Sequence, residues 1–122
     1  MPNIKVIIPA YNEEHAIANV INDLPKIVSE VIVINNNSTD NTEKKAIETG
    51  ATVLTEINKG YGYACLKGMD YIANQPIKPD IVVFLDGDYS DYPEELTALV
   101  KPIIEDNIDL VIGARAKELR ES

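Results

Sequence analysis

The chain has 122 residues, of which 45% are hydrophobic and 25% are charged, and its formal net charge is −9. This length suits one domain or part of one, and the composition is that of a soluble globular fold. Its 20 acidic residues outnumber its 11 basic ones, which excludes a duplex nucleic-acid binder with a basic face. A small anionic ligand would have to be held by a metal cation or by backbone N–H groups.

The sequence indicates a reducing compartment. No apolar run approaches the ~18 residues that a bilayer span requires. The first residues, MPNIKVIIPAYNEE, lack the pattern of a signal peptide. The single cysteine, Cys65, excludes an internal disulfide. We therefore expect a cytoplasmic location, with Cys65 as a small buried side chain on a helix.

Short β-branched runs alternate with helical patterns along the chain. The runs at 4–10, 30–35, 51–56, 80–86 and 109–114 are apolar on both faces and predict buried parallel strands. A first helix is expected from Glu13, with Asn12 as its N-cap and Pro25 as its stop. Further helices are expected at 40–49, with a cap at Ser38 or Asp40 and Gly50 at its end, at 61–73, and from Pro93.

This alternation predicts the α/β class: a Rossmann-like parallel sheet with helices on both faces and the strand order 3-2-1-4. In such sheets, ligands bind beyond the carboxyl ends of the strands, where the strand order reverses. The segments PAYNEE (9–14) and DGDYSD (86–91) would then face each other across one crevice.

The strongest chemical signal is the Asp86-Gly87-Asp88 segment at the end of an apolar strand. Two carboxylates this close repel each other, and a divalent cation reverses the sign of that interaction. Mg²⁺ and Mn²⁺ prefer oxygen ligands, often one or two carboxylates plus phosphate oxygens of a substrate. The alternative is a solvated turn that supplies acids to the next helix.

Three other loops carry weaker signals. Tyr11 could stack on a flat ring and Glu13 could bind ribose hydroxyls, or PAYNEE could be an ordinary strand–helix turn. The amides of Asn35 and Asn36 suit a base edge, whereas the polar run that follows them predicts a turn and a helix cap. The glycine-rich segment 58–68 could cradle a phosphate, or Gly68 could serve close helix packing. We interpret His15, the only histidine, as a surface residue.

Taken together, VIIPAYNEE (6–14), VIVINNNSTDNT (31–42), NKGYGYACLKGM (58–69) and VVFLDGDYSDYPEEL (82–96) resemble the nucleotide-sugar-binding half of a family-2 glycosyltransferase with the GT-A fold. The branch it resembles most contains the dolichol-phosphate mannose synthases and polyprenyl-phosphate glucosyltransferases. The resemblance implies metal-dependent transfer of a sugar from a UDP- or GDP-sugar to an acceptor, such as a polyprenyl phosphate or a glycan hydroxyl.

The resemblance also implies roles for individual residues. Nucleotide-sugar contacts would come from Pro9, Ala10, Tyr11, Glu13, Asn35, Asn36, Asp86 and Gly87. Asn35 and Asn36 fall where the family usually has an Asp-Asp or Asp-Asn pair that reads the base. Mg²⁺ or Mn²⁺ would be held by Asp86 and Asp88, with Ser90 as a third ligand.

Catalytic domains of this family are about twice as long as this chain, so residues 1–122 correspond to the donor-binding part. The segment GARAKELRES (113–122) resembles the start of an acceptor-binding half. We therefore hypothesise a longer native chain that contacts the membrane surface through the missing part, and a native mass of ~13.5 kDa, the mass of this chain, would contradict it. We expect the chain alone to bind donor without completing transfer, and no catalytic base is identified in it.

Two other functions fit an α/β sheet with paired aspartates. A nucleotidyltransferase would need a glycine-rich, basic loop after the first strand, and PAYNEEHA has neither glycine nor Lys or Arg. A non-catalytic nucleotide-binding or receiver-type domain would leave the Asp86-Gly87-Asp88 segment unexplained.

Overall fold

The computed structural model describes residues 3–85 and 109–112, with side chains over the first of these ranges. Its parallel strands form one sheet in the order β3-β2-β1-β4-β5. The strands are β1 (Ile4–Ala10), β2 (Glu30–Asn35), β3 (Thr52–Thr55), β4 (Ile81–Phe84) and β5 (Asp109–Ile112). The predicted α/β class and the predicted order 3-2-1-4 are confirmed.

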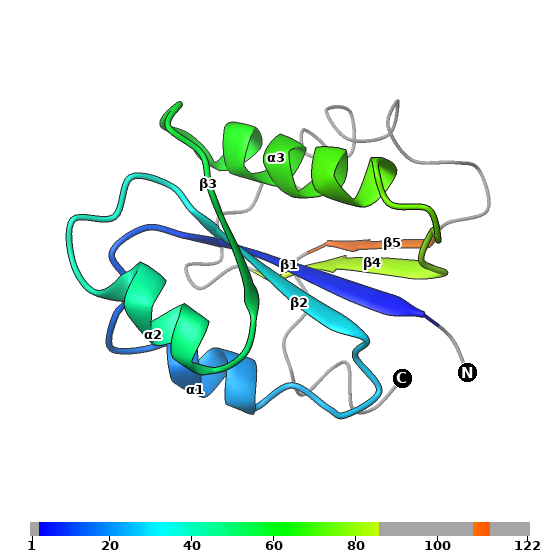
Figure 1. Cartoon of the computed structure of the whole chain (residues 1–122), viewed down its shortest axis with the longest axis horizontal. Helices are drawn as coiled ribbons and strands as arrows, with labels where there is room; N and C mark the ends of the chain where they lie inside the picture. The colour runs from blue at the N-terminus through cyan, green and yellow to red at the C-terminus, as the bar shows by residue number, and fades with distance from the viewer. Residues whose placement is uncertain (1–2, 86–108, 113–122) are drawn as a thin grey trace.

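Helices cover both faces of the sheet (Figure 1). Helix α3 (Tyr61–Ala73) lies on one face, and α1 (Ile17–Asn22) and α2 (Thr42–Glu48) lie on the other. Because side chains alternate along a strand, β1 contributes to two cores. Ile7 packs with the buried face of α3, while Val6 and Ile8 pack with α1 and α2. Each fully buried aliphatic side chain contributes about 1.5–3 kcal/mol.

Helix α3 lies close to β1 because residue 68 has no side chain. A Cβ built at Gly68 would lie 2.8 Å from Cγ2 of Ile7. Ala64, Cys65, Met69 and Ile72 complete the buried stripe of this helix. The predicted helix at 61–73 and the predicted packing role of Gly68 are confirmed, and Cys65 is the buried thiol that its position indicated.

The prediction for the first helix is wrong at its start. The helix begins at Ile17, after a turn in which Glu13 O accepts from the N–H groups of Ala16 and Ile17. Asn12 is not its N-cap: it has a left-handed backbone with φ 52°, and its Oδ1 accepts from Thr39 N instead. A contact with a residue 27 positions away therefore replaces the local cap that the sequence suggested.

The second helix is shorter than predicted, because residues 40 and 41 form its entry turn. Its first residue is Thr42, whose N–H donates to Asp40 Oδ1 at 3.0 Å. The N-cap is Asn41, which makes no side-chain cap hydrogen bond, so the predicted cap at Ser38 or Asp40 is wrong. Asp40 instead accepts from Thr42 N within the turn that precedes the helix. The predicted end is confirmed, since Gly50 follows the helix with φ 90°. The helix expected from Pro93 lies outside the described residues.

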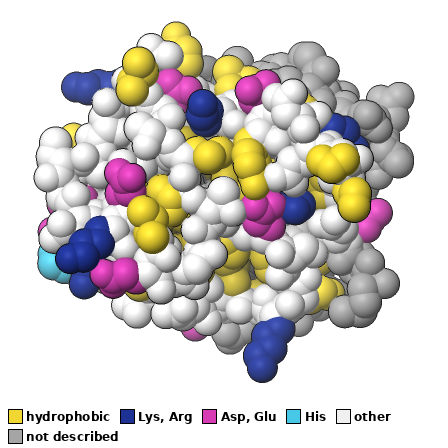
Figure 2. Space-filling view, viewed as in Figure 1, with side chains coloured by type: hydrophobic (Ala, Val, Ile, Leu, Met, Phe, Trp, Pro, Cys, Tyr) yellow, Lys and Arg dark blue, Asp and Glu magenta, His cyan; other side chains and the backbone are white. Residues whose placement is uncertain are grey.

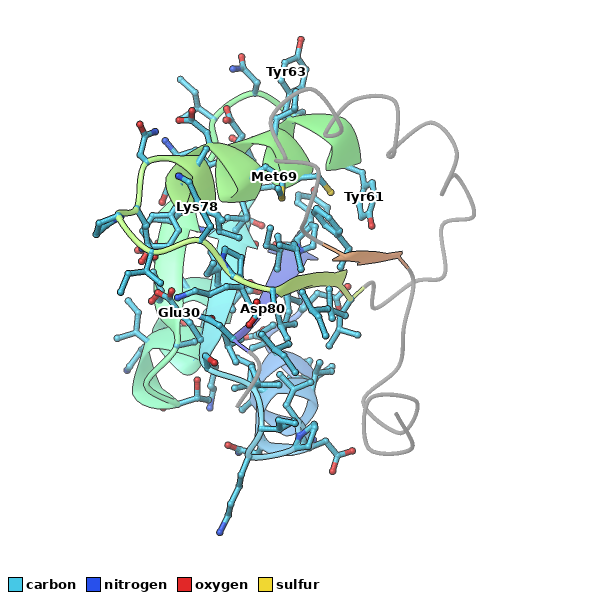
Figure 3. All side chains as sticks on the ribbon, turned by 90° about the vertical axis from the view of Figure 1, so that its right-hand side faces the viewer. Glu30, Tyr61, Tyr63, Met69, Lys78 and Asp80 are labelled. Carbon is cyan, nitrogen blue, oxygen red and sulfur yellow. The ribbon has the colours of Figure 1, made fainter. Side chains whose placement is uncertain are left out.

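The amino edge of the sheet is closed by a polar cluster (Lys5, Glu30, Thr52 and Tyr71). The Glu30 carboxylate accepts from Lys5 Nζ, Thr52 Oγ1 and Tyr71 Oη, each at 2.7 Å. Burial alone would raise the pKa of Glu30, but the hydrogen bonds from Lys5, Tyr71 and Thr52 outweigh it and lower that pKa. Figure 3 shows Glu30 at the amino ends of the strands, which face the viewer, whereas the carboxyl ends point away.

The surface in the view of Figure 2 carries scattered acidic and basic side chains that do not gather into one charged patch. Within the described ranges, no helix combines the length and the apolar character that a bilayer span requires.

Candidate donor-binding site at the carboxyl edge

The strand order brings the ends of β1, β2 and β4 together at one edge of the sheet. Ala10, the last residue of β1, pairs with Asn35, the last residue of β2. On the other side of β1, Ile7 pairs with Phe84, and Leu85 N donates to Ile7 O at 3.0 Å. The loop after β1 therefore lies between the loop after β2 and the point where the chain leaves β4 toward Asp86.

The loops after β1 and β2 are joined by hydrogen bonds from backbone to side chain. Asn12 N donates to Ser38 Oγ at 3.0 Å, and Thr39 N donates back to Asn12 Oδ1 at 2.8 Å. Asparagine tolerates the left-handed conformation of residue 12 better than most side chains do. The two loops therefore hold each other's conformation.

Further hydrogen bonds continue toward α2. Together with those of Asn12 they form what we call the brace, the set of bonds that joins the loop after β1 to residues 38–42. Glu13 N donates to Thr42 Oγ1 at 2.8 Å, and Glu14 N donates to Asp40 Oδ2 at 3.3 Å. Thr42 is fully buried, and its hydroxyl accepts from the backbone N–H of the half-buried Glu13. Desolvation raises the pKa of Asp40, but the hydrogen bonds from Thr42 and from the backbone of Glu14 together lower it by more, so the net shift of this pKa is downward.

The four predicted pocket residues of PAYNEE lie together at this edge. Pro9 and Ala10 end β1, with Ala10 buried and its carbonyl accepting from Asn36 N at 2.9 Å. Tyr11 is 58% exposed, so its ring is accessible to a planar ligand. Glu13 is half-buried in the braced turn. This placement suits a pocket wall, and contact with a nucleotide stays a prediction.

Asn35 and Asn36 are both buried, and both amides bond within the protein. Asn35 Nδ2 donates to Glu43 Oε2 at 3.2 Å, and its Oδ1 accepts from Ser38 N at 3.2 Å. Asn36 Nδ2 donates to the carbonyl oxygens of Glu56 (3.0 Å) and Asn58 (2.8 Å). That Asn35 and Asn36 read the base stays a prediction, which these contacts do not test. The contacts show that both side chains also hold neighbouring segments of the protein in place.

The predicted metal ligands Asp86, Asp88 and Ser90, together with Gly87, lie outside the described residues. Across residues 3–85 and 109–112, no group of three or more His, Cys, Asp or Glu side chains is placed to hold a metal ion. The predicted ligands of a cation therefore rest on the sequence Asp86-Gly87-Asp88 alone, which follows the buried Leu85 directly. Two carboxylates in that position match the oxygen preference of Mg²⁺ and Mn²⁺.

No local pattern predicts the hydrogen bonds between the loops after β1 and β2, whereas the glycines of segment 58–68 do predict a turn into a helix. The sequence indicates a turn or helix cap at Ser38 and a helix at Thr42, yet the hydroxyls of both bind the backbone of a distant loop. The density of Asn, Ser, Thr and Asp in NNNSTDNT was the available signal, since such side chains bond readily to backbone groups. His15 lies on the surface as predicted, with its side chain 97% exposed.

Comparison with known proteins agrees with this arrangement. Residues 5–122 match the family model described as glycosyl transferase family 2. The chain belongs to that family. Among its relatives, the chain is 36% identical to "Protein RfbJ" of Shigella flexneri, over 93% of this chain and 85% of that protein. It is 32% identical to a UDP-N-acetylglucosamine--dolichyl-phosphate N-acetylglucosaminyltransferase of Methanococcus voltae, over 97% of this chain and 54% of that protein.

Solved structures of a related enzyme share the fold. Glucosyl-3-phosphoglycerate synthase of Mycobacterium tuberculosis, in complex with Mn²⁺, UDP and phosphoglyceric acid, superimposes with a TM-score of 0.60 at 34% identity. The match covers 70% of this chain and 32% of that one. The same enzyme has also been crystallised with Mg²⁺ and UDP. This family-2 domain therefore spans about a third of that enzyme and about half of the Methanococcus voltae relative.

Proposed function

We propose that this glycosyltransferase domain binds a nucleotide-diphosphate sugar at the carboxyl edge of the sheet, for transfer of the sugar to an acceptor. The observation that carries the proposal is the position of the braced loop after β1, between the end of β2 and the exit of β4 toward Asp86. The relatives support it, because the structures of glucosyl-3-phosphoglycerate synthase contain UDP with Mn²⁺ or Mg²⁺.

In this proposal the chain's residues divide the work of holding the donor. Tyr11 stacks on the base, and Glu13 accepts hydrogen bonds from the ribose hydroxyls. Asp86 and Asp88, with Ser90 as a third ligand, would hold Mg²⁺ or Mn²⁺, and Gly87 would contact the nucleotide sugar. A divalent cation bound there supplies Lewis-acid stabilisation of the negative charge that develops on the leaving diphosphate. The braced loops contribute orientation, which places the anomeric carbon for attack.

For the acceptor we propose a polyprenyl phosphate at the cytoplasmic face of a membrane. The name of the Methanococcus voltae relative, which includes a dolichyl-phosphate acceptor, supports this class. A lipid phosphate is already anionic at neutral pH, so it can attack the anomeric carbon without a general base. This acceptor is therefore consistent with the lack of an identified base in the chain.

Calorimetric titration tests the donor site. We expect UDP- or GDP-sugar to bind with Mn²⁺ and to bind at least about tenfold more weakly without it or in Asp88→Asn, because a carboxylate ligand is lost. Asp91→Asn is the matched control, since it removes the same charge outside the proposed ligand set. Binding that ignores both the metal and Asp88→Asn would contradict the site. Transfer of labelled sugar to a solvent-extractable polyprenyl phosphate tests the acceptor, and it is assayed with the longer native protein that we hypothesise, because this chain alone is expected only to bind the donor. Absence of the labelled lipid product with that protein would contradict the proposed acceptor.

A further inference from the structure

Asn36 connects two parts of the carboxyl edge that are far apart in sequence. On one side, its backbone N–H donates to Ala10 O at 2.9 Å, next to the proposed pocket wall. On the other side, its carboxamide binds the turn 56–60, which leads from β3 into α3. One residue therefore sets the distance between the loop after β1 and this turn.

The contacts of the carboxamide make full use of its donors. Both Nδ2 hydrogens are directed to backbone carbonyls, those of Glu56 at 3.0 Å and Asn58 at 2.8 Å. Its Oδ1 accepts from Gly60 N at 3.0 Å. Asn36 is only 8% exposed, so water does not replace these bonds. With two amide hydrogens committed, Asn36 has no donor left for a nucleotide base.

The turn needs this support because its backbone is unusual. Gly60 has φ 133°, a conformation that L side chains rarely adopt, and it directly precedes α3. Glu56 N donates to Asn35 O at 3.1 Å, which places the start of the turn beside the end of β2. The turn therefore lies along the same edge as the proposed donor pocket, and Asn36 binds it at its first residue, its middle and its end.

We propose that Asn36 is a positioning residue, which holds the turn 56–60 against the end of β2 and thereby shapes one side of the donor pocket. This inference rests on the proposed donor site and replaces the base-reading role implied for Asn36. It also accounts for an amide rather than an acid at position 36, where the resemblance implies either Asp or Asn. An aspartate could accept from Gly60 N, but its oxygens would repel the carbonyls of Glu56 and Asn58.

The test uses Asn36→Asp, which keeps the shape of the side chain and removes its donors. Asn41→Asp is the matched control, because Asn41 is exposed at the start of α2 and the charge change is the same. Two readouts are measured: the rate of tryptic cleavage after Lys59, an exposed residue in the turn, and the affinity for UDP and GDP with Mn²⁺. Cleavage after the exposed Lys26 serves as an internal reference.

We expect cleavage after Lys59 to be about tenfold faster in Asn36→Asp and nucleotide binding to be about tenfold weaker, since two carbonyls lose their donors. A role in global stability alone would speed cleavage after Lys26 equally. Asn41→Asp should behave like the wild type in both readouts.

Gly60→Ala is a second variant, for the case in which Asn36→Asp does not fold. It should destabilise the same turn through backbone strain, because φ at residue 60 is 133°. A wild-type rate of cleavage after Lys59 in both variants would contradict the claim that Asn36 holds the turn 56–60. Faster cleavage with unchanged nucleotide affinity would overturn the positioning role. A wild-type protein that binds neither UDP nor GDP would contradict the proposed function instead. The cleavage rates would still show whether Asn36 holds the turn 56–60.

Discussion

The two edges of the sheet use polar side chains in opposite ways. At the amino edge, Lys5, Thr52 and Tyr71 all bond to the Glu30 carboxylate, so polar groups satisfy one another. At the carboxyl edge, side chains such as Ser38 and Thr42 bond mostly to the backbone of a neighbouring loop. The first arrangement closes an edge. The second fixes the path of the loops, which is what a binding site made from loops requires.

The largest expected effect concerns stability at the amino edge. Glu30→Ala removes the shared acceptor and leaves Lys5 Nζ, on a side chain only 12% exposed, without its partner. We expect the free energy of unfolding to fall by about 3 kcal/mol, measured by urea denaturation. Nucleotide affinity should stay within about twofold of the wild type, since the edges act separately.

Glu48→Ala is the control for Glu30→Ala, because Glu48 is exposed on α2 and should change stability by less than about 0.5 kcal/mol. A large loss of nucleotide affinity in Glu30→Ala, with the protein still folded, would show that the two edges are coupled.

A smaller effect on stability, combined with an effect on binding, is expected at the carboxyl edge. Thr42→Val keeps the shape of a fully buried side chain but leaves Glu13 N without its acceptor. We expect a loss of about 1–2 kcal/mol in the free energy of unfolding and weaker nucleotide binding by calorimetry. Thr55→Val, at an exposed position that ends β3, is the control. Unchanged binding in a destabilised Thr42→Val would show that the brace does not shape the pocket.

The smallest effect is the pH dependence of the amino edge. The folded-state pKa of Glu30 lies below its ordinary value of 4.5, so the unfolded chain binds more protons as the pH falls below 4.5. The stability from this group is therefore present above pH 4.5 and is lost as the pH falls through the folded-state pKa. Urea denaturation at pH 7 and pH 3 should show a larger acid loss in the wild type than in Glu30→Gln. Equal losses would mean that Glu30 is not stabilised as a carboxylate.

Local patterns were sufficient for most of the fold. The ends of β1, β2 and α3 coincide with the predicted ones, because apolar β-branched runs and the small residues of the α3 stripe specify them locally. Asn12 was predicted wrongly because its partner, Thr39, is distant in sequence. The contact of Tyr71 with Glu30, 41 positions apart, was likewise beyond any local pattern. Of the candidate site, the predicted strand order correctly places the loops after β1 and β2 side by side, but no local pattern shows which side chains hold them. The predicted meeting of segments 9–14 and 86–91 stays a prediction, because residues 86–91 lie outside the described residues.

The brace between the loops after β1 and β2 also bears on how such a site changes during evolution. Ser38 lies in the loop after β2 and Thr42 is the first residue of α2, yet both hold the backbone of the loop after β1, at Asn12 and Glu13. A substitution in the second loop therefore alters the first without changing its sequence. Residues on the two loops should be inherited as matched sets, and a graft of one loop alone from a relative should carry over less of its donor preference than a graft of both.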